Sequence, residues 1–263
     1  MSSWIVAKNR PKKKVTQVIK YHDTSNSVDT FAVYMDYLAA YIYSQKIGES
    51  SNVWDTSQII KNTLRSNPQI KLLKELPEAE MAQMLAISDY TYHVSPMKLK
   101  DVQKMASSVL IYTDALNIAV IRNLEKAGIR TLFDIGIHLV RELAGPNITL
   151  LKQYAASIKT YQTKSKKATL NVYVMADNYA VVTQFQAYCD PSWKITSISK
   201  TPPKEGEGDL IQSMSEIQIM SAVPALILDF NRASDRFIYL MHRNHRDMTY
   251  FVEINGKEWS LLN

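Results

Sequence analysis

The sequence contains one cysteine, Cys189, among 263 residues. A single thiol excludes an internal disulfide and a thiolate zinc cluster, and it is typical of a reducing compartment. No apolar run approaches the roughly 20 residues that cross a bilayer, so we expect no membrane span. The first residues, Met-Ser-Ser-Trp followed by Lys and Arg, include no apolar signal core, so we expect a cytoplasmic location without a signal peptide.

Several short motifs of nucleotide and hydrolytic chemistry are also absent. The sequence has no Gly-x-x-x-x-Gly-Lys-Ser/Thr loop of a P-loop ATPase and no Gly-x-Gly-x-x-Gly turn of a dinucleotide dehydrogenase. It has neither Gly-x-Ser-x-Gly nor His-Glu-x-x-His. Asp-x-Asp, whose carboxylates would hold a divalent ion against a diphosphate, is missing too. We therefore expect no metal and no other cofactor.

The chain is basic, with a net charge of +6 and a pI of about 9.1. Such a charge suits nucleic acid, an anionic membrane or a phosphorylated small molecule as a partner. Much of it lies in a short cluster, Lys8, Arg10 and 12–14, which we expect to be a solvated terminal arm rather than a nucleic-acid site. A basic α/β nucleic-acid-binding module stays open as the alternative class.

Short β-rich runs alternate with longer helical patterns, which predicts an α/β fold with parallel sheets covered by helices. The expected strands are 16–21, 52–54, 70–73, 90–94, 131–140, 170–175, 194–199, 225–228 and 248–254. The expected helices are 28–45, 56–65, 78–86, 98–105, 110–127, 149–161, 179–188, 210–221 and 232–243. We predict two Rossmann-like lobes facing a cleft, 1–127 and 128–263, divided after the long helix that ends at Gly128.

One strand-to-helix turn near the C-terminus has the pattern of an anion site. A buried strand ends at Asp229, a polar loop follows, and apolar residues then return at helical spacing. In open α/β sheets ligands bind beyond the carboxyl ends of strands, and the free N–H groups of a helix's first turn attract anions. Arg232 and Arg236 would pair with phosphate oxygens, while Asn231 and Ser234 would cap the helix or contact the phosphate.

Three stretches of the second half place polar residues at the ends of expected strands. They read Gly-Ile-His-Leu-Val-Arg-Glu over 136–142, Val-Tyr-Val-Met-Ala-Asp-Asn over 172–178, and 216–221 running into 228–236. In this order they resemble the donor domain of the fucosyltransferase superfamily, the α1,6- and protein O-fucosyltransferase group with a GT-B fold. The resemblance implies an inverting, metal-independent glycosyltransferase with a nucleotide-sugar donor and a glycan or glycoprotein acceptor.

The same resemblance implies which residues bind the donor. Glu216 stands where an acidic residue of the family recognises guanine. His138 could instead be a buried core histidine, and Asp177 could instead be the N-cap of the following helix. The chain departs from the family at Val140, where an Arg is expected, and at Asn231-Arg232, where two serines are expected; Arg232 would supply the lost positive charge. UDP- and GDP-sugars both stay open as donors. The implied donor-binding residues are His138, Arg141, Asp177, Glu216, Asp229, Asn231, Arg232, Ser234 and Arg236.

An inverting transfer needs a general base near the acceptor hydroxyl. Loops at expected strand ends of the first half offer His22, Asp23, Asp29 and Asp55, of which we expect one to be the base. The size and first-half pattern also resemble capsid-glycan transferases of large algal DNA viruses, one of which adds a core xylose. A donor of the UDP-xylose or GDP-fucose type and a role in capsid-glycan synthesis follow from that resemblance. A catalytically degenerate scaffold stays open because of Val140.

Overall fold

The computed structural model describes eleven stretches of the chain, and the account below concerns these. They are 5–7, 17–20, 30–47, 51–54, 59–73, 84–85, 97–139, 147–176, 178–198, 210–242 and 248–261. The chain divides into two compact units, Met1–Asn117 with Trp259–Asn263, and Ile118–Glu258. No helix among the described residues is long and apolar enough to span a bilayer.

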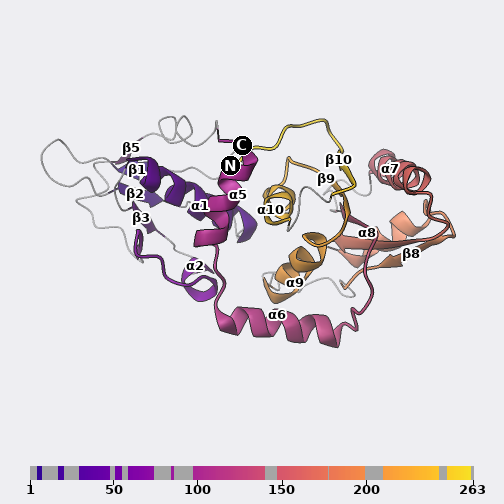
Figure 1. Ribbon diagram of the computed structural model, residues 1–263, viewed down its shortest axis with the longest axis horizontal. Helices are drawn as coiled ribbons and strands as arrows, with labels where there is room; N and C mark the ends of the chain where they lie inside the picture. The colour runs from indigo at the N-terminus through magenta and orange to yellow at the C-terminus, as the bar shows by residue number, and fades with distance from the viewer. Residues whose placement is uncertain are drawn as a thin grey trace, which may run out of the picture. The chain divides into compact units, whose positions relative to one another are not determined.

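The elements can be followed along the chain in Figure 1. The first unit contains β1 (Ile5–Ala7), β2 (Gln17–Lys20), α1 (Thr30–Ile47), β3 (Ser51–Trp54), α2 (Ile59–Thr63), β4 (Ile70–Leu73), β5 (Met84–Leu85) and α5 (Leu99–Val109). Helix α6 (Asp114–Lys126) begins in the first unit and ends in the second. The second unit continues with β6 (Ile135–Leu139), α7 (Ile148–Ser165), β7 (Leu170–Ala176), α8 (Tyr179–Gln186), β8 (Trp193–Thr196), α9 (Leu210–Met220), β9 (Ala225–Leu228), α10 (Ala233–Met241) and β10 (Tyr250–Glu253).

The first unit contains a five-stranded sheet in the order β4-β3-β2-β1-β5. Strands β2, β3 and β4 pair in parallel, as the alternation of elements predicts. Strands β1 and β5 add antiparallel pairs that the sequence analysis did not predict. The prediction of a helix over 78–86 is wrong at β5, because Met84 and Leu85 pair with Ala7 and Val6. Pairing with a strand distant in sequence overrides the local helix propensity of these residues.

Helix α1 is the buried centre of the first unit. Its sequence, Thr-Phe-Ala-Val-Tyr-Met-Asp-Tyr-Leu-Ala-Ala-Tyr-Ile, is apolar on every side rather than along one stripe. A helix of this kind is stable only when it is enclosed. Tyr34, Leu38 and Ile42 are fully buried, and the helix packs against α2, α5 and β3.

The second unit contains a parallel five-stranded sheet in the order β10-β9-β6-β7-β8. Its central strands β6 and β9 are mainly apolar and every residue of both is buried, as expected for a sheet covered on both faces. The chain runs from β6 outward through β7 to β8 and then returns to β9 on the other side of β6. The carboxyl ends of β6 and β9 therefore form the topological switch point of this sheet.

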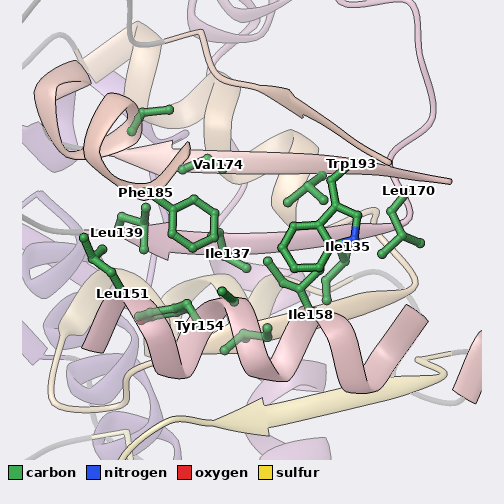
Figure 2. Packing of buried hydrophobic residues seen from close by; sticks show 14 of the residues in the cluster. Ile135, Ile137, Leu139, Leu151, Tyr154, Ile158, Leu170, Val174, Phe185 and Trp193 are labelled. Carbon is green, nitrogen blue, oxygen red and sulfur yellow. The ribbon is translucent and has the colours of Figure 1, made fainter. Parts of the chain in front are cut away.

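Alternate residues of the central strands face different helices. Ile135, Ile137 and Leu139 of β6 form one hydrophobic cluster with Tyr154 and Ile158 of α7 (Figure 2), to which α8 also contributes. The other residues of β6 face α9 and α10. A Cβ at Gly136 would lie 2.6 Å from Met220 Sδ of α9, so glycine is required there for close strand–helix packing.

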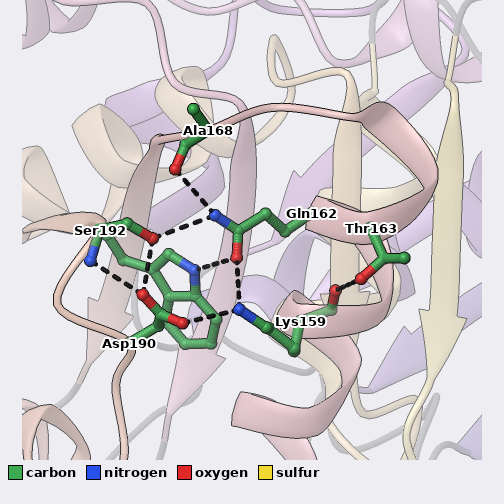
Figure 3. Close-up of polar contacts among 7 residues, drawn as sticks. Lys159, Gln162, Thr163, Ala168, Asp190 and Ser192 are labelled. Atoms are coloured by element: carbon green, nitrogen blue, oxygen red, sulfur yellow. Dashed lines mark hydrogen bonds and ion pairs between the residues drawn. The ribbon is translucent and has the colours of Figure 1, made fainter.

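A polar network joins the end of α7 to the start of β8 (Figure 3). The amide of Gln162 accepts a hydrogen bond from Trp193 Nε1 at 3.0 Å and donates to Ser192 Oγ at 3.0 Å and to the Ala168 carbonyl at 3.2 Å. Lys159 links the same amide to Asp190. Since Gln162 and Trp193 are both buried, these bonds satisfy groups that water does not reach.

We predict that Gln162→Ala destabilises the protein by about 2 kcal/mol, because it leaves the buried Trp193 N–H without its acceptor. The free energy of unfolding in urea measures this loss. Thr163→Ala is the matched control, since the neighbouring Thr163 is exposed and its hydroxyl bonds only within the helix. An equal change in the two variants would contradict this role of Gln162.

Candidate functional site

The candidate site lies at the carboxyl ends of β6 and β9, where ligands bind in open α/β sheets. His138 is the fourth residue of β6, and Asp229 follows β9 directly. The two strands pair in parallel, with Ile137 opposite Ile227. This register brings His138 and Asp229 to the same edge of the sheet, although 91 positions of sequence separate them.

The turn from β9 to α10, residues 229–235, is called the β9–α10 elbow below. Its backbone is folded by Asp229, whose carboxylate accepts the Asn231 N–H at 3.0 Å and the Asn231 side-chain amide at 2.7 Å. The Asp229 carbonyl accepts the Arg232 N–H at 3.0 Å. Burial raises the pKa of the Asp229 carboxyl, but hydrogen bonds from Asn231 and Asn255 and the charge of Arg232 outweigh it and hold that pKa below its ordinary value.

A second carboxylate, Glu253 at the end of β10, supports the elbow from the neighbouring strand. It accepts the N–H groups of Phe230 at 2.9 Å, Asn255 at 2.8 Å and Lys257 at 2.6 Å. The ring of Phe230 stacks on Phe251 of the same strand. The chain direction at the elbow is thus fixed by β10 as well as by its own turn.

Asp235, in the first turn of α10, connects the elbow to β6. Its side chain is fully buried; one carboxylate oxygen pairs with His138 Nδ1 and the other accepts the Asp229 N–H at 2.7 Å. The sequence analysis did not assign a site role to Asp235. Only the pairing of β6 with β9 brings the two side chains together, so no local pattern marks it.

The charge of Asp235 changes the titration of His138. Burial lowers the pKa of this histidine, and Arg232 lowers it further, but the contact with Asp235 and the charge of Glu216 outweigh both. The net pKa of His138 is therefore raised above its ordinary value of 6.5. The prediction that His138 lies at the site is consistent with its position, although the structure makes it a paired buried histidine.

Arg232 is the positively charged side chain of the elbow whose guanidinium group is only partly paired within the described residues. Its Nε lies 3.8 Å from Asp229 Oδ2, at the limit of an ion pair. Its Nη1 is buried and has no hydrogen-bond acceptor among the described residues. Tyr154 of α7, 1% exposed, likewise has a buried hydroxyl without a described partner. Burial raises the pKa of Tyr154, and the charges of Asp235, Asp229 and Glu253 raise it further, while that of Arg232 lowers it.

Arg232 also occupies the N-cap position of α10, where its side chain makes no capping hydrogen bond. The expected caps, Asn231 and Ser234, do not cap this helix either. By contrast, α7 is capped by Asn147, which accepts the Leu150 N–H at 3.1 Å, and α8 by Asn178, which accepts the Ala180 N–H at 2.8 Å. Among the helix starts that the structure describes, those of α7 and α8 have a side-chain cap, whereas that of α10 at the candidate site has none.

Two other expected ligands have partners inside the protein. Arg236 is buried and donates from Nη1 to the Phe230 carbonyl at 2.8 Å, so it closes the elbow from within. Glu216 of α9 is buried and accepts the Tyr173 hydroxyl at 3.3 Å. Burial and the charge of Glu216 raise the pKa of Tyr173 well above its ordinary value. Recognition of a base by Glu216 stays a prediction.

The remaining candidates lie outside the described residues. They are the four expected bases, His22, Asp23, Asp29 and Asp55, together with Val140, Arg141 and Asp177 of the donor motifs. The N-cap role considered for Asp177 belongs to Asn178. Within the described part of the chain, no group of three or more His, Cys, Asp or Glu side chains is arranged to hold a metal ion.

The chain has the fold of known fucosyltransferases. No family model matches it, and no curated protein matches it. Fucosyltransferase NodZ from Bradyrhizobium aligns with a TM-score of 0.51 at 9% identity, over 80% of this chain and 89% of NodZ. Arabidopsis thaliana FUT1, as a variant in complex with GDP, aligns with a TM-score of 0.57 at 9% identity, over 88% of this chain and 71% of that one. The expected α/β, GT-B fold and the structural resemblance to the fucosyltransferase group are confirmed.

The His138–Asp235 pair predicts a specific pH dependence of stability. Because the folded-state pKa of His138 is raised, its stabilising effect is complete below pH 6.5 and is lost as the pH rises through the raised value. Urea unfolding between about pH 6 and about pH 9 should show this loss in the unmodified protein and not in His138→Gln.

His242→Gln is the matched control for this experiment. His242 is also buried in the second unit, but burial outweighs its hydrogen bond to the Val223 carbonyl and lowers its pKa. Replacing His242 should leave the loss of folding stability above pH 6.5 unchanged, because that loss is due to His138. Identical pH profiles for the unmodified protein and His138→Gln would contradict the assignment to His138.

Proposed function

We propose that this chain is a glycosyltransferase that moves a sugar from a nucleotide-diphosphate donor to a hydroxyl of a glycan or glycoprotein. The fold supports the class of reaction, because NodZ is an α1,6-fucosyltransferase whose structures were obtained after soaking with GDP-fucose and with GDP present. At 9% identity this likeness concerns the fold, so the argument for a donor site depends on the residues at the switch point.

The observation that carries the proposal is the uncapped start of α10 beside Arg232 Nη1, which is buried and has no acceptor among the described residues. The first-turn N–H groups of a helix have no intrahelical acceptor, and they carry about half a positive charge together. A diphosphate is an anion rich in acceptors, and guanidinium pairs with it strongly. The diphosphate of a nucleotide-sugar at the β9–α10 elbow would accept hydrogen bonds both from the first-turn N–H groups of α10 and from the guanidinium of Arg232.

In the proposed reaction the elbow stabilises the leaving group. As the bond between the sugar and the diphosphate breaks, negative charge grows on the phosphate oxygens, and fixed donors stabilise that charge. Arg232, the first-turn N–H groups and His138 would supply this stabilisation without a metal ion. The acceptor hydroxyl would lose its proton to one of His22, Asp23, Asp29 and Asp55, and the sugar would be transferred with inversion.

The donor is proposed to carry GDP or UDP, and the two are separated by experiment. The GDP complexes of NodZ and FUT1 favour a guanine nucleotide. A xylose donor and a role in capsid-glycan synthesis stay predictions from the sequence resemblance.

We expect calorimetry in EDTA to show that GDP or UDP binds, and that Arg232→Ala weakens this binding about 10- to 100-fold because a charged phosphate contact is lost. Arg130→Ala is the matched control, since Arg130 is an exposed arginine of the same unit. Absence of binding by a folded protein would contradict the proposed function. Binding that requires added Mg²⁺ would contradict its metal-independent form, and normal binding by Arg232→Ala would contradict the role of Arg232.

A further inference from the structure

Both carboxylate oxygens of Asp235 form hydrogen bonds, one at strand β6 and the other just after strand β9. One oxygen pairs with Nδ1 of His138 on β6, and the other accepts the Asp229 N–H at the end of β9. The side chain is fully buried, so water does not compete for either oxygen. A buried carboxylate is tolerated where it is paired and hydrogen-bonded in this way.

This geometry decides the tautomer of His138. An ionised carboxylate only accepts hydrogen bonds, so Nδ1 of His138 must carry a hydrogen. The neutral ring would then have a lone pair on Nε2, and the protonated ring has a hydrogen there. Nε2 forms no hydrogen bond with the described residues. It is the ring nitrogen that remains for a ligand. While the carboxylate of Asp235 keeps a hydrogen on Nδ1, only the protonated ring can donate through Nε2 to a phosphate.

We infer that Asp235 is a positioning residue that acts through His138: it holds the ring by Nδ1 and keeps it in the protonated form that donates from Nε2 to the bound diphosphate. This inference rests on the proposed function. It goes beyond that function by giving nucleotide binding a titrating group inside the protein, which neither Arg232 nor the helix N–H groups provide.

The charges around His138 favour the protonated ring. Asp235 and Arg232 face it from α10, and Glu216 faces it from α9. The two carboxylates raise its pKa, whereas burial and Arg232 lower it, with a net increase. Nucleotide affinity should therefore fall as the pH rises through the raised pKa. In Asp235→Asn the carboxylate charge is gone, so the fall should occur at lower pH.

Asp235→Asn is close to isosteric and can keep both contacts. Its amide oxygen accepts the Asp229 N–H, while its NH₂ group donates to Nδ1 of His138. The neutral ring is then held in place with a hydrogen on Nε2, but its hydrogen bond to a phosphate lacks the charge that strengthens it, and the ring is protonated only at lower pH. A purely structural role of Asp235 predicts weaker folding with an unchanged pH profile, whereas positioning through His138 predicts a shifted profile.

The experiment measures GDP and UDP affinity by calorimetry in EDTA from about pH 5.5 to about pH 9 for the unmodified protein, Asp235→Asn, His138→Gln and the double variant. The terminal phosphate titrates near pH 6 on its own, by analogy with phosphorylated side chains, but this contribution is common to all four proteins. We expect about tenfold weaker binding at neutral pH for Asp235→Asn and for His138→Gln, with no further loss in the double variant. In His138→Gln, the pH dependence of nucleotide affinity should reduce to the part that comes from titration of the nucleotide phosphate.

Two further measurements keep the test decisive. Glu253→Gln removes a carboxylate that holds the elbow through Phe230 N–H without touching His138, so it should leave the pH midpoint unchanged. Nitrogen NMR of the five histidines, with His138 assigned from His138→Gln, reads its tautomer and pKa directly, even if Asp235→Asn does not fold. An unprotonated Nδ1, additive losses, or unshifted profiles in a nucleotide-binding protein would overturn the inference. Failure of the unmodified protein to bind either nucleotide would instead contradict the proposed function.

Discussion

The carboxylate of Asp235 is the constraint on which the carboxyl edge of the second sheet depends. It joins β6, through His138, to the backbone that leaves β9, and it does so from the first turn of α10. Because the group is fully buried, removing either partner would leave a charge or a donor unsatisfied inside the protein. Asp235 therefore ties the start of α10, and with it the direction of its N-terminal N–H groups, to the switch point, in addition to the bonds by which Asp229, Glu253 and Arg236 hold the elbow.

The charges at this edge are close to balance, which matters for an anion site. Asp229, Asp235 and Glu253 supply three negative charges, and Arg232 and Arg236 supply two positive ones. With His138 neutral these five side chains leave a net negative charge, and protonation of His138 cancels it, while Glu216 on α9 adds a further negative charge near the ring. The partial positive charge of a helix start, about half an elementary charge, adds to the cations that face an anion. Each of these three carboxylates is engaged by hydrogen bonds from backbone N–H groups, which offset part of its negative charge.

Elements with strong local patterns could be predicted from the sequence, and features that depend on pairing could not. Strand β9 was predicted at 225–228, as observed, because a continuous apolar run ends abruptly at Asp229. The strand, polar turn and helix around Arg232 were also predicted, because a polar turn between a buried strand and an amphipathic helix is a local signal, whereas the role of Arg232 stays a prediction. Strands β1 and β5 were missed, since three and two residues carry too little pattern and pair only with each other and with β2.

The same division applies within the site. The contact of Asp235 with His138 was missed because nothing near either residue in sequence indicates the other; the two meet only after β6 and β9 pair. The contact of Arg236 with the Phe230 carbonyl was not predicted either; it shows that an arginine in a polar turn can hold the turn itself, and donor binding by Arg236 stays a prediction. Charge and spacing indicate where an anion could bind, but hydrogen-bond partners decide which cation is left to bind it.

The start of α10 lacks a stabilising side-chain cap at the candidate site. A Ser, Thr, Asp or Asn cap contributes about 1 kcal/mol to a helix, and the chain uses asparagine in this way at α7 and α8. At α10 the cap position is Arg232, whose side chain cannot accept a hydrogen bond from the helix. A capping oxygen would occupy the N–H groups that an anion needs, and an arginine leaves them open while adding a charge of the right sign. Selection for helix stability alone would favour a small polar acceptor here, so the arginine is better explained by a ligand than by the fold.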